Sequence, residues 1–175
     1  MDNKVVKYNS IDPCDVITFG IIYKDNITRH SILETKSPFI QFPPLVCSSI
    51  SDEYLELAFD PLDKDSGNFY KWLNSIDDFI YNNIVGKEKQ RESNISINLP
   101  RKLGDNPFLK LKINKDTSFF NELKKKVDMK DIEEGMCLSC IVKIEMVKID
   151  NYELNPIWSA NQAKVKNKKE KKCFI

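Results

Sequence analysis

Two cysteines in the 175-residue chain have a spacing that could support redox chemistry or metal binding. Cys137 and Cys140 form a CxxC pair, as in redox motifs and zinc sites. A structural zinc site needs a second pair of ligands, and the sequence has neither a second CxxC nor an HxxxH. The pair also lies in a strand-like run, where positions 137 and 140 point to opposite faces. We therefore interpret both as buried strand cysteines; a redox pair and a zinc site are the weaker alternatives.

The single histidine and the densest group of carboxylates are poorly placed for catalysis. His30 stands alone, which excludes an HExxH site and favours an ordinary strand histidine. Asp60, Asp63 and Asp65 resemble half of a calcium loop, but Lys71 occupies the place of the final loop glutamate, so a turn before a helix is expected. Phosphate-binding and nucleophile-elbow motifs are absent from the sequence. We predict a protein that is not an enzyme, with no cofactor and no catalytic or metal-ligating residues.

Charge is the remaining chemical feature, and it is unevenly distributed. The chain has 27 Lys and Arg against 26 Asp and Glu, a net charge of +1. Residues 164–172 carry six Lys and one Glu, or +5, so the first 163 residues carry +1 minus +5, or −4. This asymmetry indicates a polyanion partner or a disordered tail that keeps the protein soluble. Only three of the 27 basic residues are Arg, which argues against bidentate recognition of bases or phosphates.

The hydrophobic pattern predicts an α+β, β-rich domain over residues 1–163 and a basic C-terminal tail over 164–175. Apolar residues at three- and four-residue steps predict one amphipathic core helix at about 67–85, capped by Asp65 or Ser66. Residues 117–134 fit a strand or a short helix. The runs that predict strands or extended segments are 16–23, 27–33, 37–44, 53–59, 95–100, 108–113, 137–149 and 152–165.

The longest predicted strand, 137–149, has one face that is wholly apolar and one that is mixed. Leu138, Cys140, Val142, Ile144 and Met146 form the apolar face. This alternation is typical of a sheet or barrel wall with a wet exterior. The chain shows no signal peptide and no apolar run long enough to span a membrane, so we expect a reducing compartment.

The order of elements in the C-terminal third of the chain resembles a known family. Its segments here are Phe108–Ile113, Ile132–Glu145 and the run from Ile157-Trp158 to Gln162. They resemble small single-stranded-DNA-binding-like proteins of large nucleocytoplasmic DNA viruses, which have an OB-type β-barrel. The resemblance covers about residues 66–165. It implies an OB-like barrel or related antiparallel sheet with one packed helix, and a location in the viral factory of the host cytoplasm or in the virion.

Two features bear on this resemblance. Lys, Ile and Asn together make up 60 of 175 residues, a skew expected from an AT-rich genome such as those of certain parasites, bacteria or large DNA viruses. The chain departs from the family at Ile84-Val85-Gly86-Lys87, where the family has a Trp-Phe-Gly-Lys-like element, and at Asn155-Pro156, where it has Phe-Gly.

The first functional hypothesis is sequence-independent binding of single-stranded DNA in replication, repair or packaging of a large DNA virus. Such modules combine a basic surface with aromatic side chains on which bases stack. Phe108 is one candidate for stacking. The candidate nucleic-acid contacts are Arg101, Lys110, Lys112, Lys143, Lys148, Tyr152, Trp158, Lys164, Lys166, Lys168 and Lys169. Core packing is the alternative for Trp158, and a solvated strand face is the alternative for each lysine.

The alternative hypothesis is a non-enzymatic structural protein of the virion, such as a minor capsid or cement component. Its partners would be other viral or capsid proteins. A β-domain can be reused without its ligand, and the missing aromatics at Ile84 and Val85 and the domain charge of −4 favour this alternative. Under either hypothesis, exposed strand edges would allow a homo-oligomer, and no membrane is involved.

Overall fold

The computed structural model describes residues 4–25, 30–60, 62–88, 96–97, 107–150 and 153–166. Its helical elements are the long helix α1 (Lys64–Glu88) and the single turns η1 (Tyr8–Ser10), η2 (Pro13–Asp15) and η3 (Met129–Asp131). Its strands are β1 (Val5–Lys7), β2 (Thr18–Asp25), β3 (His30–Lys36), β4 (Phe39–Gln41), β5 (Leu45–Ile50), β6 (Tyr54–Ala58), β7 (Ser96–Ile97), β8 (Phe108–Phe120), β9 (Lys126–Val127), β10 (Cys137–Asp150) and β11 (Glu153–Lys166). The predicted β-rich α+β class is confirmed.

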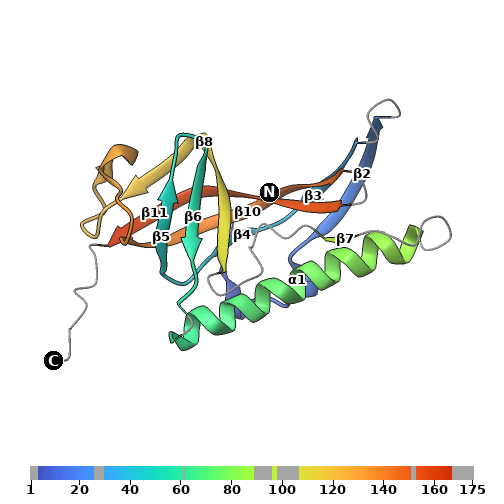
Figure 1. Ribbon diagram of the computed structural model, residues 1–175, viewed down its shortest axis with the longest axis horizontal. Coiled ribbons are helices and arrows are strands. Elements are labelled where there is room, and N and C mark those ends of the chain that lie inside the picture. Colours follow the sequence, from blue (N-terminus) through green and yellow to red (C-terminus); the bar gives the residue numbers. More distant parts are fainter. Residues whose placement is uncertain are drawn as a thin grey trace.

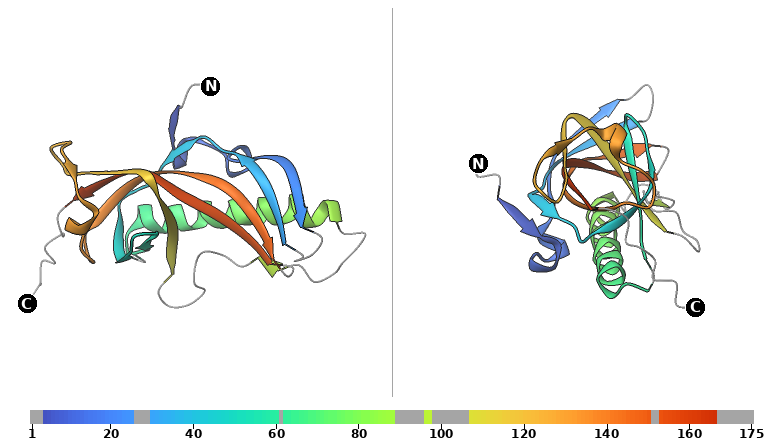
Figure 2. Two further views of the ribbon diagram at one scale, coloured as in Figure 1. Left: turned by 90° about the horizontal axis from the view of Figure 1, so that it is seen from above. Right: turned by 90° about the vertical axis from the view of Figure 1, so that its left-hand side faces the viewer.

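Five of these strands close into a barrel. β5 pairs with β6, β6 with β8, β8 with β11, β11 with β10, and β10 returns to β5. Only the β8–β11 pair is parallel, and the other four are antiparallel. If the five barrel strands are numbered by their order along the chain, their order around the ring is first, second, third, fifth, fourth. This is the OB-type arrangement, and the right-hand view of Figure 2 looks along the barrel. This confirms the predicted OB-like barrel.

The long hairpin of β10 and β11 continues beyond the barrel as an arm. There, residues 146–150 of β10 pair with β3, and β3 pairs with β2. Helix α1 runs beneath both the barrel and the arm (Figure 1). Phe19 of β2 stacks on Phe79 of α1 with ring centroids 6.0 Å apart, so the helix and the arm share packing contacts. Among the described residues, no helix combines the length and the apolar composition needed to cross a membrane.

The apolar face of α1 forms the floor of the core, as its periodicity predicted. Leu73, Ile76 and Ile80 are fully buried. The predicted cap was wrong, because the carboxylate Oδ1 of Asp63 accepts the backbone N–H of Asp65 at 2.8 Å and of Ser66 at 3.1 Å. The helix thus begins at Lys64, earlier than predicted. The acidic segment before it is a helix-capping turn, as expected from the sequence.

β10 keeps its predicted alternation only as far as Ile144. Leu138 to Ile144 bury every second side chain. A register shift against β11 between Ile144 and Met146 then reverses the phase, so Val147 is fully buried and Met146 is only half-buried. Met146 therefore leaves the predicted apolar face. A one-residue bulge exchanges the two faces of a strand, which local alternation does not predict.

The C-terminal strand extends into the segment that the sequence predicted to be a tail. β11 ends at Lys166, so the residues from Lys164 to Lys166 belong to the sheet. Residues 167–175, including Lys168 and Lys169, lie outside the described residues.

Candidate nucleic-acid interface

Strand pairing aligns four side chains in one row across the outside of the barrel. Tyr54 of β6 pairs with Lys112 of β8, Lys112 with Ser159 of β11, and Ser159 with Lys143 of β10. Residues in register on neighbouring strands point to the same side of a sheet. Beyond β10, the Lys143 Nζ atom lies 5.9 Å from the ring centroid of Phe39 in β4. This Lys112 row (Tyr54, Lys112, Ser159 and Lys143) thus has an aromatic ring at each end.

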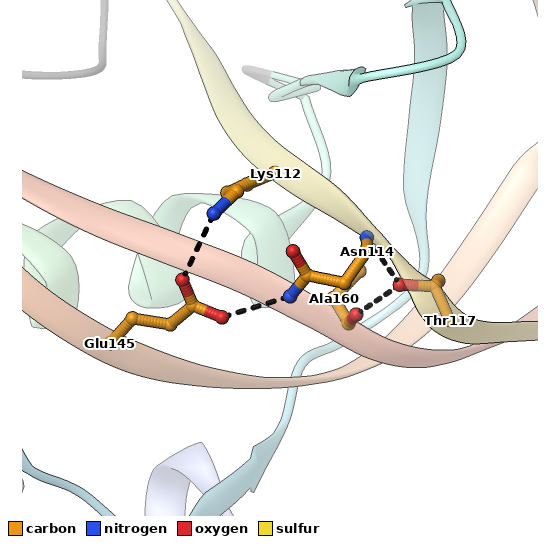
Figure 3. A network of polar contacts seen from close by, with 5 residues as sticks. All are labelled: Lys112, Asn114, Thr117, Glu145 and Ala160. Carbon is orange, nitrogen blue, oxygen red and sulfur yellow. Dashed lines mark hydrogen bonds and ion pairs between the residues drawn. The ribbon is translucent and has the colours of Figure 1, made fainter.

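A carboxylate network holds the centre of the Lys112 row (Figure 3). One oxygen of Glu145 lies 3.5 Å from the Lys112 Nζ atom, and the other accepts the side-chain N–H of Asn114 at 2.8 Å. Ser159 is a buried residue, 1% exposed, and its hydroxyl also donates a hydrogen bond to Glu145. Burial by itself would raise the pKa of Glu145, but the hydrogen bonds from Asn114 and Ser159 and the charge of Lys112 lower it below its usual value. Lys112 is therefore already compensated by an anion.

A local irregularity of β8 places Asn114 in that network. Between the pairs Ile113–Ala160 and Ser118–Gln162, β8 has four residues, 114–117, opposite the single residue Asn161. The Thr117 hydroxyl fixes this excursion, because it donates to the Ala160 carbonyl at 2.6 Å and accepts the backbone N–H of Asn114 at 2.9 Å.

Of the two aromatic rings at the ends of this row, Tyr54 is more accessible than Phe39. It is 38% exposed, and the Lys110 Nζ atom lies 4.2 Å from its ring centroid. Lys110 also lies 3.9 Å from a carboxylate oxygen of Glu56. The three lysines 110, 112 and 143 and the two glutamates 56 and 145 give +3 minus 2, or +1, so this face is weakly cationic.

The stacking role predicted for Trp158 is wrong. Trp158 is 1% exposed, and its ring lies 5.6 Å from that of Phe42 inside the core. Its neighbour Ser159 occupies the outward position, and the alternation of the strand therefore turns Trp158 inward. No base can reach either face of this ring in the folded barrel.

The other predicted contacts are dispersed over the fold. Phe108 is half-buried at the start of β8. Lys148 is exposed on the arm, where it pairs with Ile32 of β3 and Asn155 of β11, away from the Lys112 row. Lys164 and Lys166 lie near the end of β11. Arg101 and Tyr152, like Lys168 and Lys169, fall outside the described residues.

The CxxC cysteines are core residues, as predicted. Cys137 is 8% exposed and Cys140 is fully buried, and neither is in a disulfide. Burial raises the pKa of the Cys140 thiol to about 12, so this thiol stays protonated and unreactive. Across the part of the chain that the structure describes, no three His, Cys, Asp or Glu side chains come together as metal ligands would.

Sequence reasoning missed Tyr54 as a surface aromatic. A usable signal was present in the sequence, because strand alternation places Tyr54 on the same face as the charged Glu56. The structure agrees, since Leu55 and Leu57 on the other face are fully buried. Phe39 was missed because its proximity to Lys143 depends on long-range pairing of β4 with β10.

Similarity to known proteins comes from structure alone. No protein-family model and no curated protein matches the sequence. The single-stranded DNA-binding protein gp2.5 of bacteriophage T7 is similar with a TM-score of 0.55 and 10% sequence identity, over 73% of this chain and 90% of that one. The single-stranded DNA-binding protein of bacteriophage Enc34 is similar with a TM-score of 0.49 and 12% identity, over 85% and 88% of the two chains.

A structure of the Enc34 protein in complex with single-stranded DNA is also similar, with a TM-score of 0.46 and 11% identity, over 89% of this chain and 98% of that one. At identities this low, likeness is a statement about the fold. The OB-type assignment rests on the closed strand pairing and on the T7 protein, which has the higher TM-score.

Proposed function

We propose that this protein binds single-stranded DNA without sequence preference, through the outer face of β6 and β8. The observation that carries the proposal is the position of the exposed Tyr54 ring, beside Lys110 and Lys112 on the second and third strands of an OB-type barrel. OB-folds bind oligonucleotides on this face. The fold of the T7 protein supports the same class of ligand.

In this proposal a base stacks on Tyr54, and lysines contact the backbone phosphates. The base takes the place of the Lys110 ammonium over the ring, and Lys110 moves to a phosphate. Lys112 and Lys143 continue the contacts along the row. Aromatic stacking is tolerant of base identity because every base has a π-face, and lysine contacts to phosphate carry no sequence information. This chemistry needs no catalytic group and no cofactor.

The biological setting is a finer part of the proposal. We infer a role in replication, repair or packaging of a large DNA virus, with the protein in the viral factory or in the virion. The order of motifs in residues 66–165 and the Lys-, Ile- and Asn-rich composition support this setting. The T7 protein, whose fold is similar, is encoded by a bacteriophage.

The test is binding of fluorescein-labelled oligo(dT), followed by anisotropy at two salt concentrations. We expect binding at low salt that weakens as salt rises. Tyr54→Ala should weaken binding roughly 5- to 150-fold, the effect of one lost stack of ~1–3 kcal/mol. Tyr54→Phe, which keeps the ring, should bind like the wild type.

The matched control is Tyr81→Ala, which removes the same side chain from a half-buried position on α1. Deletion of residues 167–175 is the second control, because it leaves β11 intact. No binding at low salt would exclude the function. If wild-type binding is retained by Tyr54→Ala but is lost on the deletion, the tail alone would account for it.

A further inference from the structure

A second row of side chains crosses the opposite end of β8. Lys126 of β9 pairs with Phe120 of β8, Phe120 with Lys164 of β11, and Lys164 with Ser139 of β10. Both lysines are exposed, and Phe120 is half-buried. We call these four residues the Phe120 row. An aromatic ring thus lies between two lysines, each on a neighbouring strand and in register with it.

The Phe120 row lies on the same outer surface of the barrel as the Lys112 row. The inward side is marked by Leu111 and Phe119, which are buried, so Lys112 and Phe120 on the alternate positions point outward. The adjacent outward pair, Ser118 and Gln162, is neutral. Phe120 lies eight positions after Lys112 in β8, a span of at most roughly 26 Å at ~3.3 Å per residue.

The two rows each contain two lysines, but they differ in the carboxylates nearby. Lys112 lies 3.5 Å from Glu145, whereas the Phe120 row gains a third lysine, because Lys166 lies two residues beyond Lys164 on the same side of β11. In the described part of the chain, none of the three lysines at the Phe120 row lies within ion-pairing distance of a carboxylate; the sheet ion pairs there involve Lys110 and Lys112. The segment that follows Lys166 adds four more lysines and one glutamate.

We propose that the Phe120 row is a second contact site for the DNA strand that crosses the Lys112 row. A base stacks on Phe120, Lys126 and Lys164 contact the phosphates on either side of it, and Lys166 extends the track along β11. The inference rests on the proposed function. It adds an anchoring position that short strands do not use together with Tyr54. A footprint of two such positions falls within the ~4–16 nucleotides that an OB-fold covers.

The test measures the affinity that the protein gains when oligo(dT) is lengthened from ~4 to ~16 nucleotides, the range of OB-fold footprints. In the wild type, the longer strand engages both rows and binds more tightly. Phe120→Ala and Phe120→Leu should each reduce this gain roughly 5- to 150-fold, because both lack a ring for stacking. Phe120→Tyr should keep the gain. In addition, a 16-mer with 5-iodouracil should cross-link to the peptide that contains Phe120.

Charge reversal at the two lysines provides an independent test. Lys126→Glu/Lys164→Glu should abolish the gain with length. Lys64→Glu/Lys71→Glu changes the net charge by the same amount at exposed positions of α1 and should leave the gain intact. Thermal unfolding of each variant reports whether the fold persists.

The outcomes separate the two proposals. A wild-type protein that binds neither oligonucleotide at low salt overturns the proposed function and this inference together. A wild-type protein that gains affinity with length, and whose Phe120→Leu and double-lysine variants gain as much, overturns the second site alone. Loss of the gain in Phe120→Ala with full retention in Phe120→Leu overturns stacking on the ring.

Discussion

The Lys112 row and the Phe120 row use the same kinds of residue, but only the first is electrostatically compensated. Lys112 shares Glu145 with Asn114 and Ser159, whereas the lysines beside Phe120 have no such partner in the described residues. A lysine that stays paired with a carboxylate neutralises less phosphate charge, so fewer of the cations condensed on the DNA are released when it binds. An aromatic ring beside a lysine is therefore not sufficient to predict how strongly a surface binds DNA. The carboxylates near each lysine determine how much of its charge is available to a phosphate.

The largest difference between the rows should appear in stability. Lys112→Glu places a second carboxylate beside Glu145, whose side chain is only 16% exposed. We expect a loss of about 2 kcal/mol in the free energy of unfolding, less than the ~3–5 kcal/mol for breaking a fully buried pair, since Lys112 is 42% exposed. Lys164→Glu should change it by no more than about 0.5 kcal/mol. Urea denaturation measures both, and equal losses would contradict the contrast.

The salt dependence of DNA binding should separate the rows next. Replacing Lys126 and Lys164 with Gln should reduce the slope of log K against log salt by roughly 1.4, or ~0.7 for each released phosphate contact on a single strand. Replacing Lys110 and Lys112 with Gln should reduce it less, because their glutamate partners already screen them. Anisotropy titrations over a salt series give both slopes. The reverse order would show that the glutamates release their lysines on binding.

Local patterns in the sequence predicted the elements whose hydrophobic periodicity is visible within a few residues. The helix and the β10–β11 hairpin are such elements, because the helical repeat and the strand alternation are both short. β5 was missed, since Pro43 and Pro44 precede it and Leu45 to Ile50 has no strict alternation. The sequence predicted a strand over 108–113 and either a strand or a short helix over 117–134. In the structure β8 continues to Phe120, because pairing with β11 resumes after the excursion at residues 114–117.

The site was less predictable than the fold, because it depends on register between distant strands. Lys112 was proposed from its alternation within β8, but its neighbours Tyr54 and Glu145 lie on other strands. Phe120 and Lys126 were not selected, since nothing local indicates that β9 places a lysine beside the ring. Trp158 was assigned to the wrong face for a related reason. Burial is decided by closure of the barrel, which composition does not encode.

The acid sensitivity of stability should reflect the anion of the Lys112 row. Folding lowers the pKa of Glu145, so its ionised form favours the folded state. This contribution is complete above the usual glutamate pKa of about 4.3 and is lost as pH falls through the lower folded-state value. Glu145→Gln should therefore be less stable than the wild type at pH 6, and the difference should shrink by pH 3. Urea denaturation at pH 6 and at pH 3 measures the difference in stability between the two proteins. If that difference is the same at both pH values, the pKa of Glu145 does not change on folding.

The smallest effect is also the most direct test of compensation. Glu145→Gln keeps a side chain that can accept from Asn114, but it removes the charge that holds Lys112. We expect single-stranded DNA to bind about two- to threefold more tightly, with a salt slope steeper by roughly 0.7 as Lys112 becomes available to a phosphate. Glu34→Gln, at an exposed position on β3, adds the same charge on the arm and should change neither quantity. If both variants tighten binding equally, net charge rather than the local pair governs affinity, and the Lys112 row loses its distinct role. If only Glu145→Gln does so, the glutamate sets the strength of this face.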